Sequence, residues 1–217
     1  FGGVGRNPVN PALTGRLFVF LSWPALVAPS AYPLPQFRLF EWFSGAPDAL
    51  SGATPLALTK LGELPLAEPM PQLLLQFKPG CIGEISSLVL LLGGLYLVFV
   101  QVVNFRIPLG MFAGSAAAHL LYSLFVPMPD LFTQWLSGGF LLGAFFMATD
   151  PVTAAVTSLG QWLYALTIGV LVILIRVVNP AFPEGTMLAI LFGNITAPLF
   201  DYYVVRAHVR RRKLRHA

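Results

Sequence analysis

The sequence is dominated by uninterrupted apolar runs of roughly 20 residues, and these runs constrain the fold more than any other feature. Five runs have clear boundaries of turn or charged residues, and they cover residues 82–103, 107–126, 131–149, 160–178 and 187–205. A weaker sixth run covers residues 13–28. A helix of about 20 apolar residues crosses about 30 Å of hydrocarbon. We therefore expect an all-α fold, a polytopic membrane helical bundle with about six spans.

The composition agrees with a membrane location. Hydrophobic residues make up 56% of the chain and charged residues 10%, and the mean hydropathy is +0.75. This balance excludes a water-soluble enzyme. The single cysteine, Cys81, excludes a disulfide framework within the chain and gives too few thiolates for an iron–sulfur or zinc cluster from this chain alone. Any redox chemistry therefore needs another cofactor.

Glycines and prolines recur inside the apolar runs. We interpret the small residues at 92–94, 110–118 and 137–139 as places where helices pack closely, because small side chains let backbones approach in lipid. Pro108 and Pro198 are the expected positions of broken or re-entrant helices, since a proline frees a backbone carbonyl.

Basic residues predict the topology. Six of the thirteen Lys and Arg residues lie between Arg206 and Arg215, so we expect residues 206–217 to form a cytoplasmic basic tail that meets anionic lipid, not nucleic acid. Counting five spans back from the tail places the polar connection 29–81 on the outer side. Arg176 is the exception, because the same count puts it near the outer end of its span.

Two aspartates stand at the ends of apolar runs. Asp150 follows the run 131–149 and Asp201 lies near the end of the last run, and the topology places both toward the cytoplasmic side. A carboxylate at that depth is costly unless it is paired, hydrated or bound to a cation. The residues alone leave two readings open for each aspartate: an interfacial hydrogen-bond acceptor or a cation ligand.

Two polar motifs lie outside these runs. The opening segment 2–13, GGVGRNPVNPAL, predicts an ordered polar turn at the membrane boundary, because its glycines and Asn-Pro steps disfavour a helix interior. No strand precedes it, so a dinucleotide-binding loop is not indicated. The sequence SGAT at 51–54 on its own indicates only a loop hydroxyl at Thr54.

Several segments together resemble one family. They are FMATDPVT at 146–153, IRVVNPAFPEG at 175–185, APLFD at 197–201, GEIS at 83–86, the opening motif and SGAT. In this order they closely resemble the membrane-protein family that includes the B subunit of the bacterial sodium-translocating NADH:quinone oxidoreductase and the homologous D subunit of the Rnf complex. The resemblance covers essentially the whole chain, and the NPAFPEG run is more similar to the NADH:quinone oxidoreductase member of the pair.

The resemblance implies cofactors and site residues. It implies that Thr54 carries FMN through a phosphoester bond, that a noncovalent riboflavin is also bound, and that Asp150 and Asp201 belong to a sodium pathway. Whole family members carry further spans before the opening motif, so the resemblance implies that residues 1–217 are a single transmembrane flavoprotein domain without those spans.

The resemblance also implies a function. The expected function is electron relay through the flavins toward ubiquinone, coupled to sodium export, in a multi-pass subunit of the bacterial inner membrane. The expected partners are the other subunits of the complex, quinone, sodium ion and the lipid bilayer, without nucleic acid. An Rnf-type subunit whose electron partner is ferredoxin, and a transporter without redox chemistry, remain the alternatives.

Overall fold

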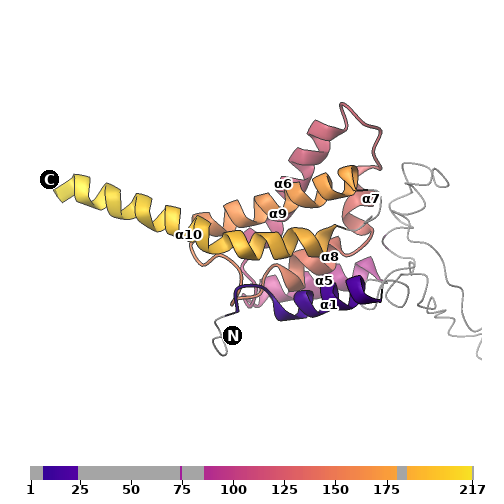
Figure 1. Cartoon of the computed structure of the whole chain (residues 1–217), viewed down its shortest axis with the longest axis horizontal. Coiled ribbons are helices and arrows are strands. Elements are labelled where there is room, and N and C mark those ends of the chain that lie inside the picture. The colour runs from indigo at the N-terminus through magenta and orange to yellow at the C-terminus, as the bar shows by residue number, and fades with distance from the viewer. Residues whose placement is uncertain (1–6, 24–73, 75–85, 180–184, 217) are drawn as a thin grey trace, which may run out of the picture.

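The computed structural model describes residues 7–23, 74, 86–179 and 185–216, and within these residues every regular element is a helix. In chain order the elements are α1 (Pro11–Ser22), α5 (Ser87–Phe99), α6 (Arg106–Tyr122), α7 (Leu131–Leu136), α8 (Phe140–Leu142), the π-helix η2 (Gly143–Met147), α9 (Ser158–Val178) and α10 (Thr186–His216) (Figure 1). The expected all-α class is confirmed for this part of the chain. The connection 29–81, apart from residue 74, lies outside the described residues, and Thr54 with it.

Local sequence sets where the helices begin. Side-chain oxygens accept from backbone N–H groups of the first turn at four helices, and these caps are Asn10 for α1, Ser86 for α5, Asp130 for α7 and Thr157 for α9. Such caps satisfy donors that have no partner inside the helix. Pro11 follows its cap at the first position of α1, where a missing N–H costs nothing.

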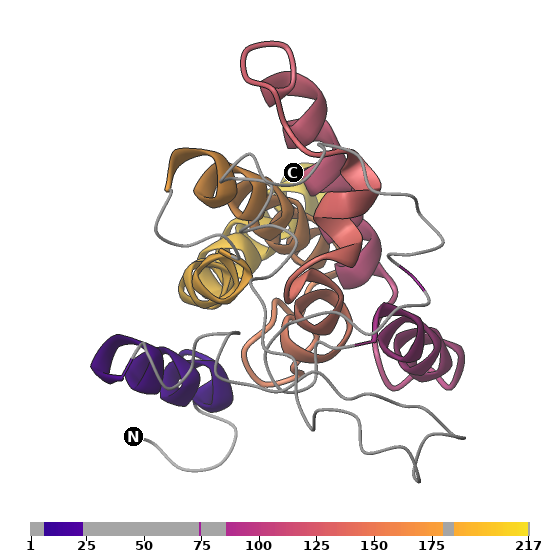
Figure 2. The same ribbon diagram turned by 90° about the vertical axis from the view of Figure 1, so that its right-hand side faces the viewer.

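Helix α9 is central to the bundle. It packs along α6 on one side and along α10 on the other, as the view along the bundle shows (Figure 2). A Cβ atom added at Gly114 of α6 would lie 2.4 Å from the Leu166 carbonyl oxygen, and one at Gly169 of α9 would lie 2.3 Å from that of Met111. The backbones of α6 and α9 therefore touch, which confirms the packing interpretation of residues 110–118.

The third apolar run is not one span. Helix α7 ends at Leu136, Gly138 has a φ of 66°, and the chain then continues through α8 and η2. The interpretation of residues 137–139 as a packing stretch is therefore wrong at Gly138, because a left-handed backbone interrupts the helix there and glycine adopts it without a steric penalty.

The two breaks expected at prolines are also wrong. Pro108 is in the first turn of α6, where its N–H would have no helical partner in any case. Pro198 lies inside α10, which continues past it to His216. Prolines are tolerated in membrane helices because the loss is limited to one backbone hydrogen bond, with neighbouring groups able to compensate.

The described residues contain two helices that are long and apolar enough to cross a membrane on their own, α9 and α10. Helix α5, with 13 residues, is shorter than a bilayer is thick, so six full spans are not confirmed. Large apolar side chains cover the outside of the bundle, and examples more than half exposed are Phe18, Leu92, Phe99, Phe125 and Ile195. An apolar exterior of this kind is typical of a protein that faces lipid.

Helix α10 carries the basic tail. It runs as one helix from Thr186 to His216, and its last turns extend beyond the other helices (Figure 1). The described tail residues 206–214 are thus a helical extension of the last apolar run. Which side of the membrane they occupy stays a prediction.

Candidate functional site

One end of the bundle brings three polar segments together. They are the chain after η2, which contains Asp150, the start of α9, and the part of α10 around Asp201. The sequence placed both aspartates on the same side, and the structure agrees, because Asp201 bonds to the loop that follows Asp150.

Asp201 holds the chain at the start of helix α9, at its N-cap Thr157. Its Oδ2 accepts from the Val156 N–H at 2.8 Å, and its Oδ1 accepts from the N–H and the hydroxyl of Thr157 at 2.9 and 2.5 Å. The carboxylate is half-buried and lies at the positive end of the α9 dipole, which stabilises its charge. A Cβ atom at Gly160 would lie 2.4 Å from Asp201 Oδ1, so this contact depends on a glycine in the first turn of α9.

Asp150 has more local contacts. Its Oδ2 accepts from the Thr153 hydroxyl at 2.8 Å, its Oδ1 from the Val152 N–H at 3.3 Å, and its carbonyl from the Ala154 N–H at 3.0 Å. The residue therefore organises the turn between η2 and α9. Its carboxylate is half-buried and its side-chain hydrogen bonds come from its own segment.

The two aspartates lie at the same end of the bundle, but they do not belong to one cluster of metal ligands. Within the described part of the chain neither carboxylate pairs with Lys or Arg, and no group of three or more His, Cys, Asp or Glu side chains could hold a metal ion. A cation at this end would therefore need neutral oxygens in addition to a carboxylate. Backbone carbonyls, hydroxyls and amides are the available donors.

The C-terminal end of η2 supplies such oxygens. The Ala148 N–H bonds to the Gly143 carbonyl at 2.8 Å and closes the π-helix, so the following carbonyls lack helical partners. The N-cap residue of α1, a side chain of α9 and a side chain of the local chain bond to them instead. The donors are Asn10 to the Met147 carbonyl at 3.4 Å, Thr149 to Phe145 at 2.7 Å and Tyr164 to Ala148 at 3.2 Å.

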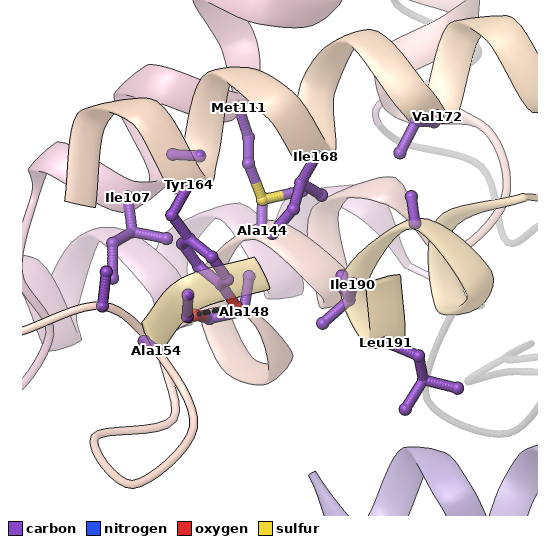
Figure 3. Close-up of a cluster of buried hydrophobic side chains, with 14 of the residues drawn as sticks. Ile107, Met111, Ala144, Ala148, Ala154, Tyr164, Ile168, Val172, Ile190 and Leu191 are labelled. Carbon is purple, nitrogen blue, oxygen red and sulfur yellow. Dashed lines mark hydrogen bonds between the residues drawn. The ribbon is translucent and has the colours of Figure 1, made fainter. Parts of the chain in front are cut away.

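Sequence reasoning missed Asn10, Thr157 and Tyr164 as parts of this end of the bundle. A signal was present for Tyr164, since a tyrosine inside an apolar run has to find a partner for its hydroxyl when it is buried. Figure 3 shows its side chain pointing from α9 to the end of η2 at Ala148. The partner itself is set by packing and could not be read from the sequence.

Arg176, at the opposite end of α9, explains the exception in the charge pattern. It is 3% exposed, and its guanidinium donates to the Gln134 side chain at 2.8 Å and to the Ser137 carbonyl at 3.3 Å. It also donates to the Gln134 carbonyl. Arg176 therefore binds carbonyls freed where α7 ends, and its position reflects a structural role more than topology.

Comparison with known proteins identifies the family to which this fold and site belong. A family model described as the NQR2, RnfD, RnfE family matches residues 1–210. The chain belongs to this family. The resemblance recognised in the sequence is thereby confirmed.

Curated relatives match almost the whole chain. A protein of Klebsiella pneumoniae (strain 342) is 44% identical over 229 residues, covering 99% of this chain and 53% of the relative. A Yersinia pestis protein is also 44% identical, and one from Haemophilus influenzae (strain ATCC 51907 / DSM 11121 / KW20 / Rd) is 43% identical, with the same coverage. All three are named as the B subunit of a Na(+)-translocating NADH-quinone reductase. The chain spans about half the length of these relatives.

Proposed function

We propose that this chain belongs to the membrane subunit of a sodium-translocating NADH:quinone oxidoreductase. The subunit relays electrons through covalently bound FMN and through riboflavin toward ubiquinone, and this transfer is coupled to sodium export. The observation that carries the proposal is the identity of 43–44% over 99% of the chain to proteins named as the B subunit of that complex. A flavin suits the relay because it exchanges one or two electrons, while the protein positions it.

Thr54 is the proposed FMN attachment site. It is the last residue of the SGAT motif, and its hydroxyl is the only side-chain atom of the residue able to form a phosphoester. Gly52 and Ala53 beside it have small side chains, which would present little steric obstacle to a flavin transferase. The riboflavin site is not assigned to particular residues.

The flavin proposal is tested by replacing the hydroxyl. In cells with an active flavin transferase, Thr54→Ala in the full-length subunit should abolish the fluorescent flavin band on a denaturing gel while the subunit stays in the membrane. Ser51→Ala is the matched control, because it removes a hydroxyl from the same motif and should keep the band. A fluorescent band that survives Thr54→Ala would refute the assignment.

Asp150 and Asp201 are the proposed acidic residues of the sodium pathway. Sodium prefers hard oxygen ligands, and both carboxylates are half-buried at one end of the bundle without a basic partner among the described residues. The hydrogen bonds of Asp201 support helix capping as well, so the two roles need separate readouts. The side chain of Asp150 makes fewer hydrogen bonds than that of Asp201, so fewer contacts compete with an ion role.

The sodium proposal is tested in the assembled complex. Asp150→Asn and Asp201→Asn should each raise the sodium concentration that half-saturates quinone reduction, and the flavin content should not change. An unchanged half-saturating concentration in both variants would remove the ion role. It would leave the turn after η2 as the function of Asp150 and the contact with the start of α9 as the function of Asp201.

The proposed location is the bacterial inner membrane, in a multi-pass subunit with the basic tail in the cytoplasm and other subunits of the complex as partners. The family also contains RnfD proteins, so an Rnf-type complex is the second candidate. Quinone-dependent NADH oxidation by the assembled complex separates the two. Absence of any bound flavin would instead support a non-redox transporter.

A further inference from the structure

We propose that Tyr164, Asn194 and the Ala148 carbonyl form a binding step for a dehydrated monovalent cation in the core of the bundle. This inference rests on the proposed sodium-translocating function and extends the pathway inward from Asp150 and Asp201. The site is built from neutral oxygens on α9, on α10 and at the end of η2.

Three oxygen atoms converge at this point. Tyr164 Oη lies 2.9 Å from Asn194 Oδ1 and 3.2 Å from the Ala148 carbonyl oxygen. Tyr164 and Ala148 are 0% exposed and Asn194 is 1% exposed. Figure 3 shows the hydrogen bond between Tyr164 and Ala148 inside the buried cluster. All three are hydroxyl, amide or carbonyl oxygens, the hard donor type that Na⁺ prefers.

The protein alone cannot satisfy every polar atom here. A tyrosine hydroxyl has one proton, so it can donate to Asn194 or to Ala148 but not to both. The Asn194 Nδ2 atom is buried and has no hydrogen-bond partner within the part of the chain that the structure describes. Turning the amide over lets the nitrogen donate to Tyr164, and the Asn194 oxygen then loses its donor. In the first orientation the open atom is an N–H donor, which does not bind a cation, whereas in the second it is the Asn194 oxygen, which does. Native cores avoid such an open polar atom unless a ligand or water completes the site.

Asn194 has a second oxygen of this kind on its backbone. A helical carbonyl normally accepts from the N–H four residues later, and for Asn194 that residue is Pro198, which has no N–H. The proline does not break α10, as the fold shows, but it removes this hydrogen bond. Asn194 therefore has both an open side-chain amide and a backbone carbonyl that lacks its helical donor.

The position also favours a positive charge. The end of α8 and η2 is the C-terminal, negative end of a half-helix in the bundle interior, and such ends bind cations in membrane transporters. Asp150 follows Ala148 by two residues and adds a carboxylate beyond this end. The π-helix before it widens the backbone, a feature that is frequent at functional sites.

The site is in register with the capping contact at the end of the bundle. Tyr164 is seven residues after Thr157 on α9, and Asn194 is seven residues before Asp201 on α10. A spacing of seven residues is about two helical turns, or about 10 Å, and it keeps both pairs on the same helix faces. The two polar contacts therefore form an outer step with a carboxylate and an inner step with neutral oxygens.

The test uses the full-length subunit in the assembled complex. Tyr164→Phe removes the hydroxyl and keeps the ring, and we expect the half-saturating sodium concentration to rise about tenfold, which corresponds to about 1.4 kcal/mol. The ratio of the half-saturating concentrations for Li⁺ and Na⁺ should also change, because one ligand oxygen is lost, while the flavin band at Thr54 should remain. Thr167→Val and Thr196→Val are the matched controls, since they remove hydroxyls that bond only within α9 and α10.

A purely structural role gives a different pattern. Lower turnover of Tyr164→Phe at an unchanged sodium half-saturation and an unchanged Li⁺/Na⁺ ratio would overturn the proposal. Should Tyr164→Phe fail to assemble, Asn194→Ser provides the same readouts with a shorter oxygen ligand.

A binding measurement that needs no turnover distinguishes failure of the ion site from failure of the proposed function. Sodium should raise the melting temperature of the purified wild-type subunit more than potassium does, and Tyr164→Phe should lose this difference. A sodium-specific shift in the subunit, together with no quinone reductase activity of the assembled complex, would keep the ion site and refute the proposed function. No sodium-specific shift in the wild type would refute the ion site.

Discussion

Gly160→Ala is expected to destabilise the protein, although the same change usually strengthens a helix. Gly160 is buried in the first turn of α9, and a Cβ atom there would lie 2.4 Å from Asp201 Oδ1 and 2.4 Å from Thr157 Oγ1. The added methyl group would push the Asp201 carboxylate away from the start of α9. The contact at risk is the one that joins α10 to α9 at the proposed sodium entrance.

The magnitude follows from the hydrogen bonds of that carboxylate. Asp201 accepts three of them, at 2.8, 2.9 and 2.5 Å, from Val156 and Thr157. Hydrogen bonds to a charged group contribute about 1.5–3 kcal/mol each when buried, and a half-exposed site gives less. Ala gains up to about 1 kcal/mol over Gly in helix propensity. Losing or stretching two of the three bonds therefore leaves a net loss of about 1–3 kcal/mol.

Thermal unfolding of the purified full-length subunit in detergent measures this effect. A loss of about 1–3 kcal/mol lowers the melting temperature by several degrees. Gly15→Ala is the matched control, because Gly15 lies in α1 and a Cβ atom there would meet no atom within 4 Å. That variant should be as stable as the wild type or slightly more stable.

A double-mutant cycle isolates the contact. In an Asp201→Ala background the clashing carboxylate is gone and the Thr157 hydroxyl can rotate, so Gly160→Ala should cost much less than in the wild type. An equal cost in both backgrounds would show that the methyl group acts through another contact. A Gly160→Ala variant as stable as Gly15→Ala would refute the geometry of this cap.

Three further outcomes are expected. Gly169→Ala should lower the unfolding free energy by about 1–3 kcal/mol or prevent assembly, because its Cβ would meet the α6 backbone at 2.3 Å, and the melting temperature measures this. Arg176→Met should lower the melting temperature while keeping the sodium half-saturation, because it removes donors to the end of α7, about 1.5–3 kcal/mol for each charged hydrogen bond. Cysteines placed near His216 and near Glu63 should react oppositely with a membrane-impermeant thiol reagent in intact cells, and labelling of the tail with protection of Glu63 would contradict the predicted topology.

The sequence by itself determined the class of protein. Apolar runs long enough to cross a bilayer leave few folds other than a helical bundle, because backbone groups in lipid must bond within their own segment. The motifs along the chain, including those around Asp150 and Asp201, were sufficient to recognise the family, and counting runs placed both aspartates at the same end of the bundle. These properties depend on residue type and order along the chain.

Only the tertiary structure decided where the helices break and what the polar side chains contact. Gly138, not Pro108 or Pro198, interrupts a helix, because a break is stable where other helices bond to the freed carbonyls, as Arg176 does after α7. The partners Tyr164 and Asn194 are thirty residues apart in the chain and meet because α9 packs against α10. Residue type shows that a buried hydroxyl needs a partner, but only packing of helices chooses which one it meets.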